Sequence, residues 1–140
     1  LEGLRVIREQ APPGLEIAAG EYGYTIDYFH RMLEAGAVDV LQADVTRCEG
    51  FTGFLHVAAL CEAYHTPLSA HCAPALSTPV CCAIHCLRHI EYFHDHVRIE
   101  NMLFEGVPQP RDGYLEPNIS MPGLGLKFLR DKAEQYRESY

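Results

Sequence analysis

The sequence predicts an α/β fold in which parallel strands alternate with helices. Short apolar runs that read as strands occur at 15–19, 38–43 and 67–70. Each run is followed by a polar turn and then by a segment whose apolar residues recur at helical spacing. Because the connections are short, such strand–helix units are expected to pair their strands in parallel through right-handed crossovers.

The first unit begins with the strand Leu15–Ala19, which ends before Gly20 and Glu21. Thr25 is a typical N-cap for a helix that starts at Ile26. One face of this helix is apolar, and a glycine ends it. The apolar face consists of Ile26, Phe29 and Leu33, and the glycine is Gly36.

The second unit begins with the strand Val38–Ala43, which ends at Asp44. A turn is predicted at 50–53, where two glycines bracket the segment. The helix that follows this turn has a buried stripe made of Phe54, Val57, Ala58 and Cys61.

The third unit begins with the strand Pro67–Ala70, which ends at His71. Pro79 suits the first turn of the next helix. A fourth strand is predicted at 89–92, and a proline-rich extended tail beyond it closes with a short polar helix after Asp131. The buried face of the helix after Pro79 consists of Val80, Ile84 and Leu87.

A side chain capable of acid–base or metal chemistry lies at the C-terminal end of each predicted strand. Parallel barrels build their active sites at this end, from residues of several strands. An open doubly wound sheet binds ligands at a switch point, often with a glycine-rich phosphate turn, and the sequence contains neither G-x-G-x-x-G nor a P-loop. A barrel is therefore favoured. The four residues are Glu21, Asp44, His71 and Glu91.

Composition narrows the classes of partner. The 140 residues carry a formal net charge of -8 without a Lys/Arg cluster, so neither nucleic acid nor a membrane is expected as a partner. No apolar stretch approaches the roughly 20 residues of a membrane-spanning helix, and no secretory leader is expected. The six cysteines, four of them within 72–86, are expected to be reduced thiols in a cytoplasmic protein.

Four short segments resemble the mandelate racemase subgroup of the enolase superfamily. They are 19–23 (Ala-Gly-Glu-Tyr-Gly), 42–47 (Gln-Ala-Asp-Val-Thr-Arg), 69–71 (Ser-Ala-His) and 90–92 (Ile-Glu-Tyr). The intervals of 23, 27 and 20 residues between Glu21, Asp44, His71 and Glu91 are similar to those of the family across its last four strands. The segment 122–126 also resembles the family's closing segment.

The resemblance implies the C-terminal half of a TIM-like (β/α)7β barrel with an extended C-terminal tail. Residues 1–140 would then form the C-terminal portion of the barrel domain. The N-terminal capping domain and the early strands would lie outside these residues. Full-length members of such a family are expected to form homo-oligomers.

The resemblance also implies roles for individual residues. Glu21 is similar to a carboxylate ligand of the family's Mg²⁺ ion, and Asp44 with His71 resembles its general acid–base dyad. Glu91 resembles the residue that hydrogen-bonds the substrate carboxylate, and Arg47 stands where a basic, substrate-binding residue is usual. One departure is Glu49-Gly50, where the family commonly has two glycines.

These residue types suit the removal of a proton next to a carboxylate. Such a proton is very weakly acidic, because its loss adds negative charge to an anionic group, and a bound Mg²⁺ offsets this charge as a Lewis acid. An imidazole such as that of His71 exchanges protons near neutral pH, and Asp44 would orient it. We expect dehydration of an acid sugar, a small-molecule carboxylate. Racemisation or epimerisation of a 2-hydroxy acid is the alternative.

The chain by itself is predicted to be inactive. The family supplies two further metal carboxylates from earlier strands, and only 20 residues precede Glu21. Four strands would also leave two open parallel edges.

An alternative from a different functional class is that the chain is a zinc-binding structural module. Four residues would share one helix face by their spacing of three and four residues, with further potential ligands nearby. The four are Cys82, His85, Cys86 and His89, and the nearby ligands are Cys72, His94 and His96.

Overall fold

The computed structural model describes residues 1–138. Residues 1–138 contain no helix that is both long and apolar enough to span a membrane. All six cysteines have free thiols. The elements in chain order are α1 (Glu2–Gln10), β1 (Ala18–Ala19), α2 (Ile26–Glu34), β2 (Val40–Ala43), α3 (Gly50–Ala63), β3 (Leu68–Ala70), α4 (Pro74–Cys81), β4 (Leu87–Ile90), α5 (His94–Leu103), β5 (Phe104–Glu105), β6 (Lys127–Phe128), α6 (Arg130–Ala133) and a 3-10 turn (Glu134–Tyr136).

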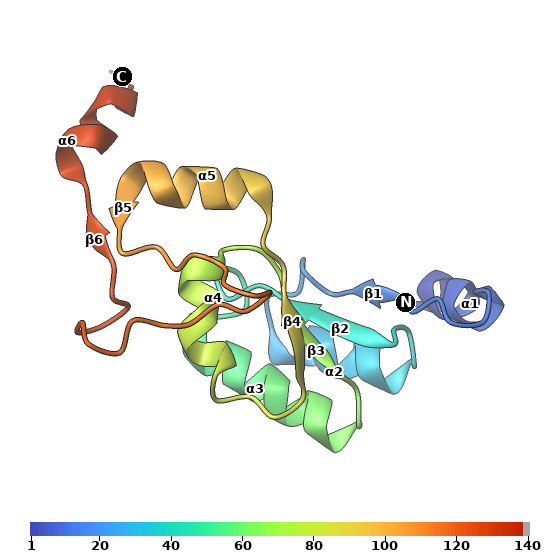
Figure 1. The fold of residues 1–140 in the computed structure, drawn as a ribbon. Coiled ribbons are helices and arrows are strands. Elements are labelled where there is room, and N and C mark those ends of the chain that lie inside the picture. The colour runs from blue at the N-terminus through green and yellow to red at the C-terminus, as the bar shows by residue number, and fades with distance from the viewer. Residues whose placement is uncertain (139–140) are drawn as a thin grey trace.

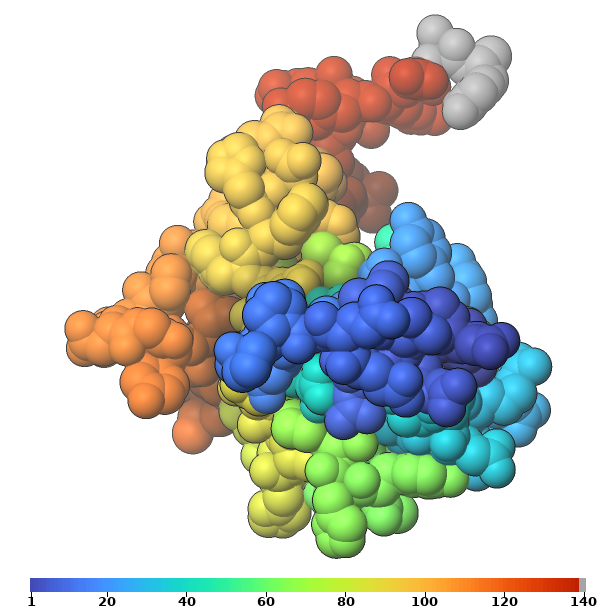
Figure 2. All heavy atoms as spheres, turned by 90° about the vertical axis from the view of Figure 1, so that its right-hand side faces the viewer, coloured from blue at the N-terminus to red at the C-terminus, as the bar shows by residue number. Residues whose placement is uncertain are grey.

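Strands β1 to β4 form one sheet in sequence order, and every pairing is parallel. The helices α2, α3 and α4 connect successive strands, and Figure 1 shows α2 and α3 below the sheet. The predicted alternation of parallel strands and helices is therefore confirmed. Figure 2 shows the N-terminal residues across the front of the molecule, while the segment that contains α6 projects away from it.

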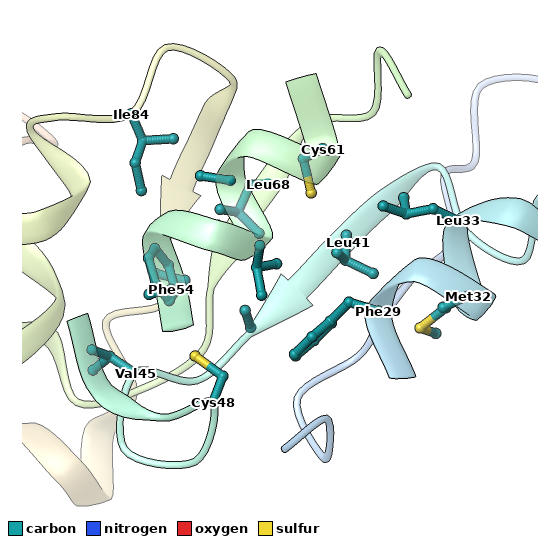
Figure 3. Packing of buried hydrophobic residues seen from close by; sticks show 14 of the residues in the cluster. Phe29, Met32, Leu33, Leu41, Val45, Cys48, Phe54, Cys61, Leu68 and Ile84 are labelled. Atoms are coloured by element: carbon teal, nitrogen blue, oxygen red, sulfur yellow. The ribbon is translucent and has the colours of Figure 1, made fainter. Parts of the chain in front are cut away.

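The hydrophobic core lies between the sheet and the helices that follow its strands. Leu41 of β2 and Leu68 of β3 are completely buried and lie near Phe29 of α2 and Phe54 of α3 (Figure 3). Burying a side chain of this size contributes about 1.5–3 kcal/mol. This packing fixes which face of each strand points toward the helices, because side chains alternate along a strand.

The opposite face of the sheet carries a polar row. Gln42 pairs in register with Ser69, and Ser69 pairs with His89. The Ser69 hydroxyl is buried without a hydrogen-bond partner among residues 1–138. Since the side-chain period of a strand is two residues, the residues two positions further along fall on this same face, just beyond the strand ends. These are Asp44, His71 and Glu91.

Several element boundaries differ from the predicted ones. The helix predicted from Pro79 begins at Pro74, and Pro79 lies inside it. Pro74 takes the first-turn position that proline prefers. The turn predicted at 50–53 is the first turn of α3, and the fourth strand, predicted at 89–92, is Leu87–Ile90.

The region beyond β4 contains more structure than the predicted extended tail. The helix α5 and the antiparallel pair β5–β6 precede the predicted short polar helix, which is α6. Neither α5 nor the N-terminal helix α1 contains a buried residue. Both helices are short and lie outside the three predicted strand–helix units.

Glu49 occupies a backbone conformation that favours glycine. Its φ is 66°, and φ of Gly50 is 69°. The left-handed conformation costs a residue with a Cβ about 1–2 kcal/mol. A glycine in the unfolded chain loses more entropy on folding, which offsets about 0.5–1 kcal/mol of any gain. We expect Glu49→Gly to raise the free energy of unfolding of the complete protein by about 0.5–1 kcal/mol, as measured by urea titration.

The matched control is Glu34→Gly at the exposed end of α2, where the backbone is helical. This variant should lower the free energy of unfolding, because glycine is a poor helix former. Destabilisation by both variants would contradict the assigned strain at Glu49.

Candidate active site

Asp44 and His71 form a hydrogen-bonded pair at the C-terminal ends of neighbouring strands. Ala43 and Ala70 are register partners in β2 and β3, so the residue after each strand lies beside the other. The backbone N–H of His71 also donates to the Ala43 carbonyl at 2.9 Å. The distance between His71 Nδ1 and Asp44 Oδ2 is 2.9 Å. The Asp44 side chain is 1% exposed and that of His71 is 20% exposed, so the histidine is the accessible member of the pair.

The surroundings of Asp44 keep its carboxylate ionised. Burial alone would raise the pKa of Asp44, but hydrogen bonds from Thr46 and His71, with the charge of Arg47, outweigh burial and lower this pKa. The backbone N–H and the hydroxyl of Thr46 donate to Oδ1 at 2.8 and 2.6 Å. An ionised carboxylate only accepts hydrogen bonds, so the proton of the pair sits on His71 Nδ1 and leaves Nε2 available as a base.

Glu91 faces His71 from the end of β4. Its Oε2 lies 3.8 Å from His71 Nε2, and its Oε1 accepts a hydrogen bond of 2.7 Å from Gln42 Nε2. Cys72 Sγ lies 3.4 Å from His71 Nε2 and 3.8 Å from Glu91 Oε2. The structure therefore brings together three of the predicted site residues, Asp44, His71 and Glu91.

Sequence reasoning missed Gln42, Thr46 and Cys72. Gln42 lies two residues before Asp44 and so shares its face of the sheet. This two-residue spacing is visible in the sequence and could have identified Gln42. Thr46 follows Asp44 at the spacing of an aspartate turn. The sequence indicates Cys72 only as a potential zinc ligand.

Arg47 links Asp44 to the segment that follows β1. Its Nη1 lies 3.6 Å from Asp44 Oδ2 and donates to the Glu21 carbonyl at 3.2 Å. The guanidinium carbon lies 5.0 Å from the centre of the Tyr22 ring. These contacts suit a positioning role for Arg47, and its predicted contact with substrate stays a prediction.

Glu21 fits a Mg²⁺ ion as one ligand of several. Its side chain is partly buried, and its Oε2 accepts a hydrogen bond of 3.1 Å from the N–H of Gly20. Mg²⁺ prefers hard oxygen ligands in an octahedral arrangement, so a carboxylate suits it. No group of three or more potential ligands within residues 1–138 includes Glu21. The remaining ligands would have to come from other parts of the protein.

The predicted zinc-binding module is wrong. Its four residues do not share a helix face, because α4 ends at Cys81 and His89 lies in β4. His96 Nδ1 accepts the N–H of Ala73 at 3.1 Å. Of the seven predicted ligands, only Cys72 belongs to a group with converging ligand atoms in the described part of the chain.

Gln42 positions Glu91, and its loss is expected to reduce turnover. Gln42→Leu removes the donor to Glu91 Oε1. Since a typical hydrogen bond contributes about 0.5–1.5 kcal/mol, we expect kcat of the complete protein to fall about 2- to 10-fold. Gln10→Leu, the same change at the exposed end of α1, is the control and should leave kcat unchanged. An unaltered kcat and pH profile in Gln42→Leu would refute this role.

Comparison with known proteins supports one family. Residues 1–132 match the family model described as "Enolase C-terminal domain-like". A D-galactonate dehydratase from Cronobacter sakazakii is 30% identical over 132 residues, which cover 86% of this chain and 34% of the relative.

Two solved structures are also similar. One is a mandelate racemase/muconate lactonizing enzyme-like protein from Rubrobacter xylanophilus, with 51% identity and a TM-score of 0.91 over 96% of this chain and 37% of that protein. The other is an L-talarate dehydratase from Polaromonas sp. JS666 complexed with Mg and L-glucarate, with 28% identity and a TM-score of 0.81 over 95% of this chain and 35% of that protein. The predicted fold, the C-terminal half of a parallel barrel, is therefore confirmed. The chain spans about a third of the length of these proteins.

Proposed function

The chain belongs to the enolase C-terminal domain-like family, and on this premise we propose that it carries the acid–base residues of a Mg²⁺-dependent acid-sugar dehydratase. The observation that carries the proposal is the pair formed by Asp44 and His71, 2.9 Å apart, with His71 Nε2 directed toward Glu91. The similarity to a D-galactonate dehydratase and to a talarate dehydratase supports the choice of reaction.

His71 acts as the base in this proposal. Its Nδ1 proton is held by Asp44, so the free Nε2 accepts the proton from the carbon next to the substrate carboxylate. The negative charge of Asp44 then stabilises the imidazolium that forms.

Glu91 stabilises the charge that the substrate gains. In its protonated form Glu91 donates a hydrogen bond to the substrate carboxylate, an interaction that is strongest where water is excluded. A Mg²⁺ ion held by Glu21 and by ligands from the rest of the protein would supply Lewis-acid stabilisation of the same carboxylate.

In the second half of the reaction, His71 transfers the proton to the leaving group. The His71 imidazolium donates it to the hydroxyl on the next carbon, which leaves as water, and the resulting enol rearranges to a keto acid. Racemisation or epimerisation would instead require the original carbon to receive a proton on its opposite face, from a second acid in another part of the complete protein. The two reactions share the first step, the removal of the proton by His71.

The test is turnover of acid sugars by the complete protein with Mg²⁺. D-galactonate is the first substrate to try, because a D-galactonate dehydratase is among the similar proteins. We expect a keto acid that lacks the elements of one water molecule, identified by mass and NMR spectroscopy. An epimer without keto acid would assign the protein to the racemase alternative. Keto acid formation that continues at the same rate without divalent metal would contradict the proposal.

Residues 1–140 expressed alone are expected neither to bind Mg²⁺ tightly nor to turn over substrate. Glu21 supplies a single carboxylate, whereas Mg²⁺ needs about six oxygen ligands. The strands β1 and β4 are also open edges of the sheet. Calorimetric titration with Mg²⁺ and an activity assay check this expectation, and clear turnover by the isolated chain would contradict it.

A further inference from the structure

His71, Cys72 and Glu91 direct a nitrogen, a sulfur and an oxygen atom toward one point. Cys72 Sγ lies 3.4 Å from His71 Nε2 and 3.8 Å from Glu91 Oε2, and the distance between Nε2 and Oε2 is 3.8 Å. Among the residues that the structure describes, this is the one group of three His, Cys, Asp or Glu side chains with all ligand atoms within 4.8 Å.

The three distances lie within about half an ångström of the edges of a tetrahedral zinc site. Zinc bonds of about 2.0–2.3 Å at tetrahedral angles place neighbouring ligand atoms about 3.3–3.6 Å apart. Adjustments of a few tenths of an ångström would bring all three atoms onto one ion. Three protein ligands would leave the fourth position for water or for an oxygen of another molecule.

A hydrogen bond to a neighbouring side chain orients both His71 and Glu91. Asp44 accepts from His71 Nδ1 and so directs Nε2 toward the point of convergence. Gln42 donates to Glu91 Oε1 and leaves Oε2 facing Cys72. Zinc sites in proteins commonly have such outer partners, which fix the orientation of the ligands.

The charges around Cys72 favour a cation. The Glu91 carboxylate lies 3.8 Å from Cys72 Sγ, and the Asp44 carboxylate lies behind His71. The two carboxylates attract a divalent ion to this point, and a metal ion displaces the thiol proton as it binds sulfur. Sulfur selects a soft ion such as Zn²⁺ over Mg²⁺, which prefers oxygen.

We propose that His71, Cys72 and Glu91 form a binding site for a thiophilic divalent cation such as Zn²⁺, distinct from the Mg²⁺ ligand Glu21. An ion at this site occupies His71 Nε2, the atom that must accept the substrate proton, and so inhibits the enzyme. The inhibition rests on the proposed function, whereas the binding does not.

Cobalt titration of the complete protein tests the binding directly. Saturating Mg²⁺ is present to fill sites with oxygen ligands, and Co²⁺ replaces Zn²⁺ because a cobalt–thiolate bond produces a characteristic near-ultraviolet band. We expect one cobalt ion per chain with this band and its displacement by Zn²⁺. Cys72→Ser should abolish the band and weaken Zn²⁺ binding by at least about 10- to 100-fold, since even outer partners of a metal ligand have effects of this size.

The matched control is Cys82→Ser. Cys82 is exposed and lies in the turn after α4, away from the three ligands. This variant should keep both the band and the Zn²⁺ affinity. His71→Asn is a second test that leaves the thiol in place, and it should also weaken binding.

Two results would overturn the proposal. One is an unchanged cobalt–thiolate band in Cys72→Ser, and the other is stoichiometric binding that never produces the band. If binding follows the expected pattern but Zn²⁺ does not inhibit turnover, the site stands and the role of His71 as the base is wrong. Failure of the binding experiment would leave the proposed dehydration reaction untouched.

Discussion

Replacement of His71 by asparagine is expected to lower kcat of the complete protein by about 10²- to 10⁴-fold, the usual contribution of a general acid or base. Asparagine retains a donor toward Asp44 but cannot accept a proton at the position of Nε2. The measurement is steady-state turnover of the preferred acid sugar at saturating Mg²⁺. Binding of Mg²⁺ should be unchanged, because Glu21 is not among the side chains that His71 contacts.

The matched control for this variant is His65→Asn. His65 is exposed and has a φ of 53°, a left-handed conformation that asparagine tolerates well. Its replacement should leave kcat within about twofold of the wild-type value, as is usual for surface changes. Equal kcat values in the two variants and in the wild type would contradict the role of His71.

Replacement of Gly20 by alanine is expected to cause a large loss of stability. The φ of Gly20 is 134°, and a Cβ built at this residue would lie 2.3 Å from the Gln42 carbonyl oxygen. The backbone conformation and the steric overlap together would cost about 2–5 kcal/mol. Because the Gly20 N–H also holds Glu21 Oε2, Mg²⁺ affinity should fall in the same variant. Urea unfolding and calorimetric titration measure the two effects.

Gly14→Ala separates the two causes. Gly14 also has a positive φ, 88°, but no atom lies within 4 Å of a Cβ built there. This variant should lose only the conformational part and keep its Mg²⁺ affinity. This part is about 0.5–1 kcal/mol once the lower entropy of alanine in the unfolded chain is included. If Gly20→Ala were no less stable than Gly14→Ala, the close approach of β1 to β2 would not hold.

The sequence predicted the centre of the fold better than its periphery. Leu41 and Leu68 lie in strands whose buried character is visible as apolar runs, so β2 and β3 were expected near their observed positions. The parallel pairing of these strands then places Asp44 beside His71, and this consequence could be predicted without a structure. The helix α5 could not be predicted by periodicity, because it contains no buried residue.

Local exceptions explain the remaining differences. Pro79 is a frequent signal for a helix start, but Pro74 provides the same signal five residues earlier, and the structure uses Pro74. The resulting early end of α4 separates Cys82 from His89, so a zinc module based on one continuous helix fails. The hydrogen bond between Gln42 and Glu91 joins side chains 49 residues apart in the sequence and depends on the order of the strands.

The most direct test of the account follows the proton on the carbon next to the substrate carboxylate. The complete protein, Mg²⁺ and an acid sugar are combined in D₂O, and the signal of this proton is recorded by NMR spectroscopy for the wild type and for His71→Asn. Both dehydration and racemisation remove this proton, so the account predicts that its signal disappears with the wild type and persists with His71→Asn. Loss of the signal at equal rates with both proteins would contradict the assignment of His71 as the base.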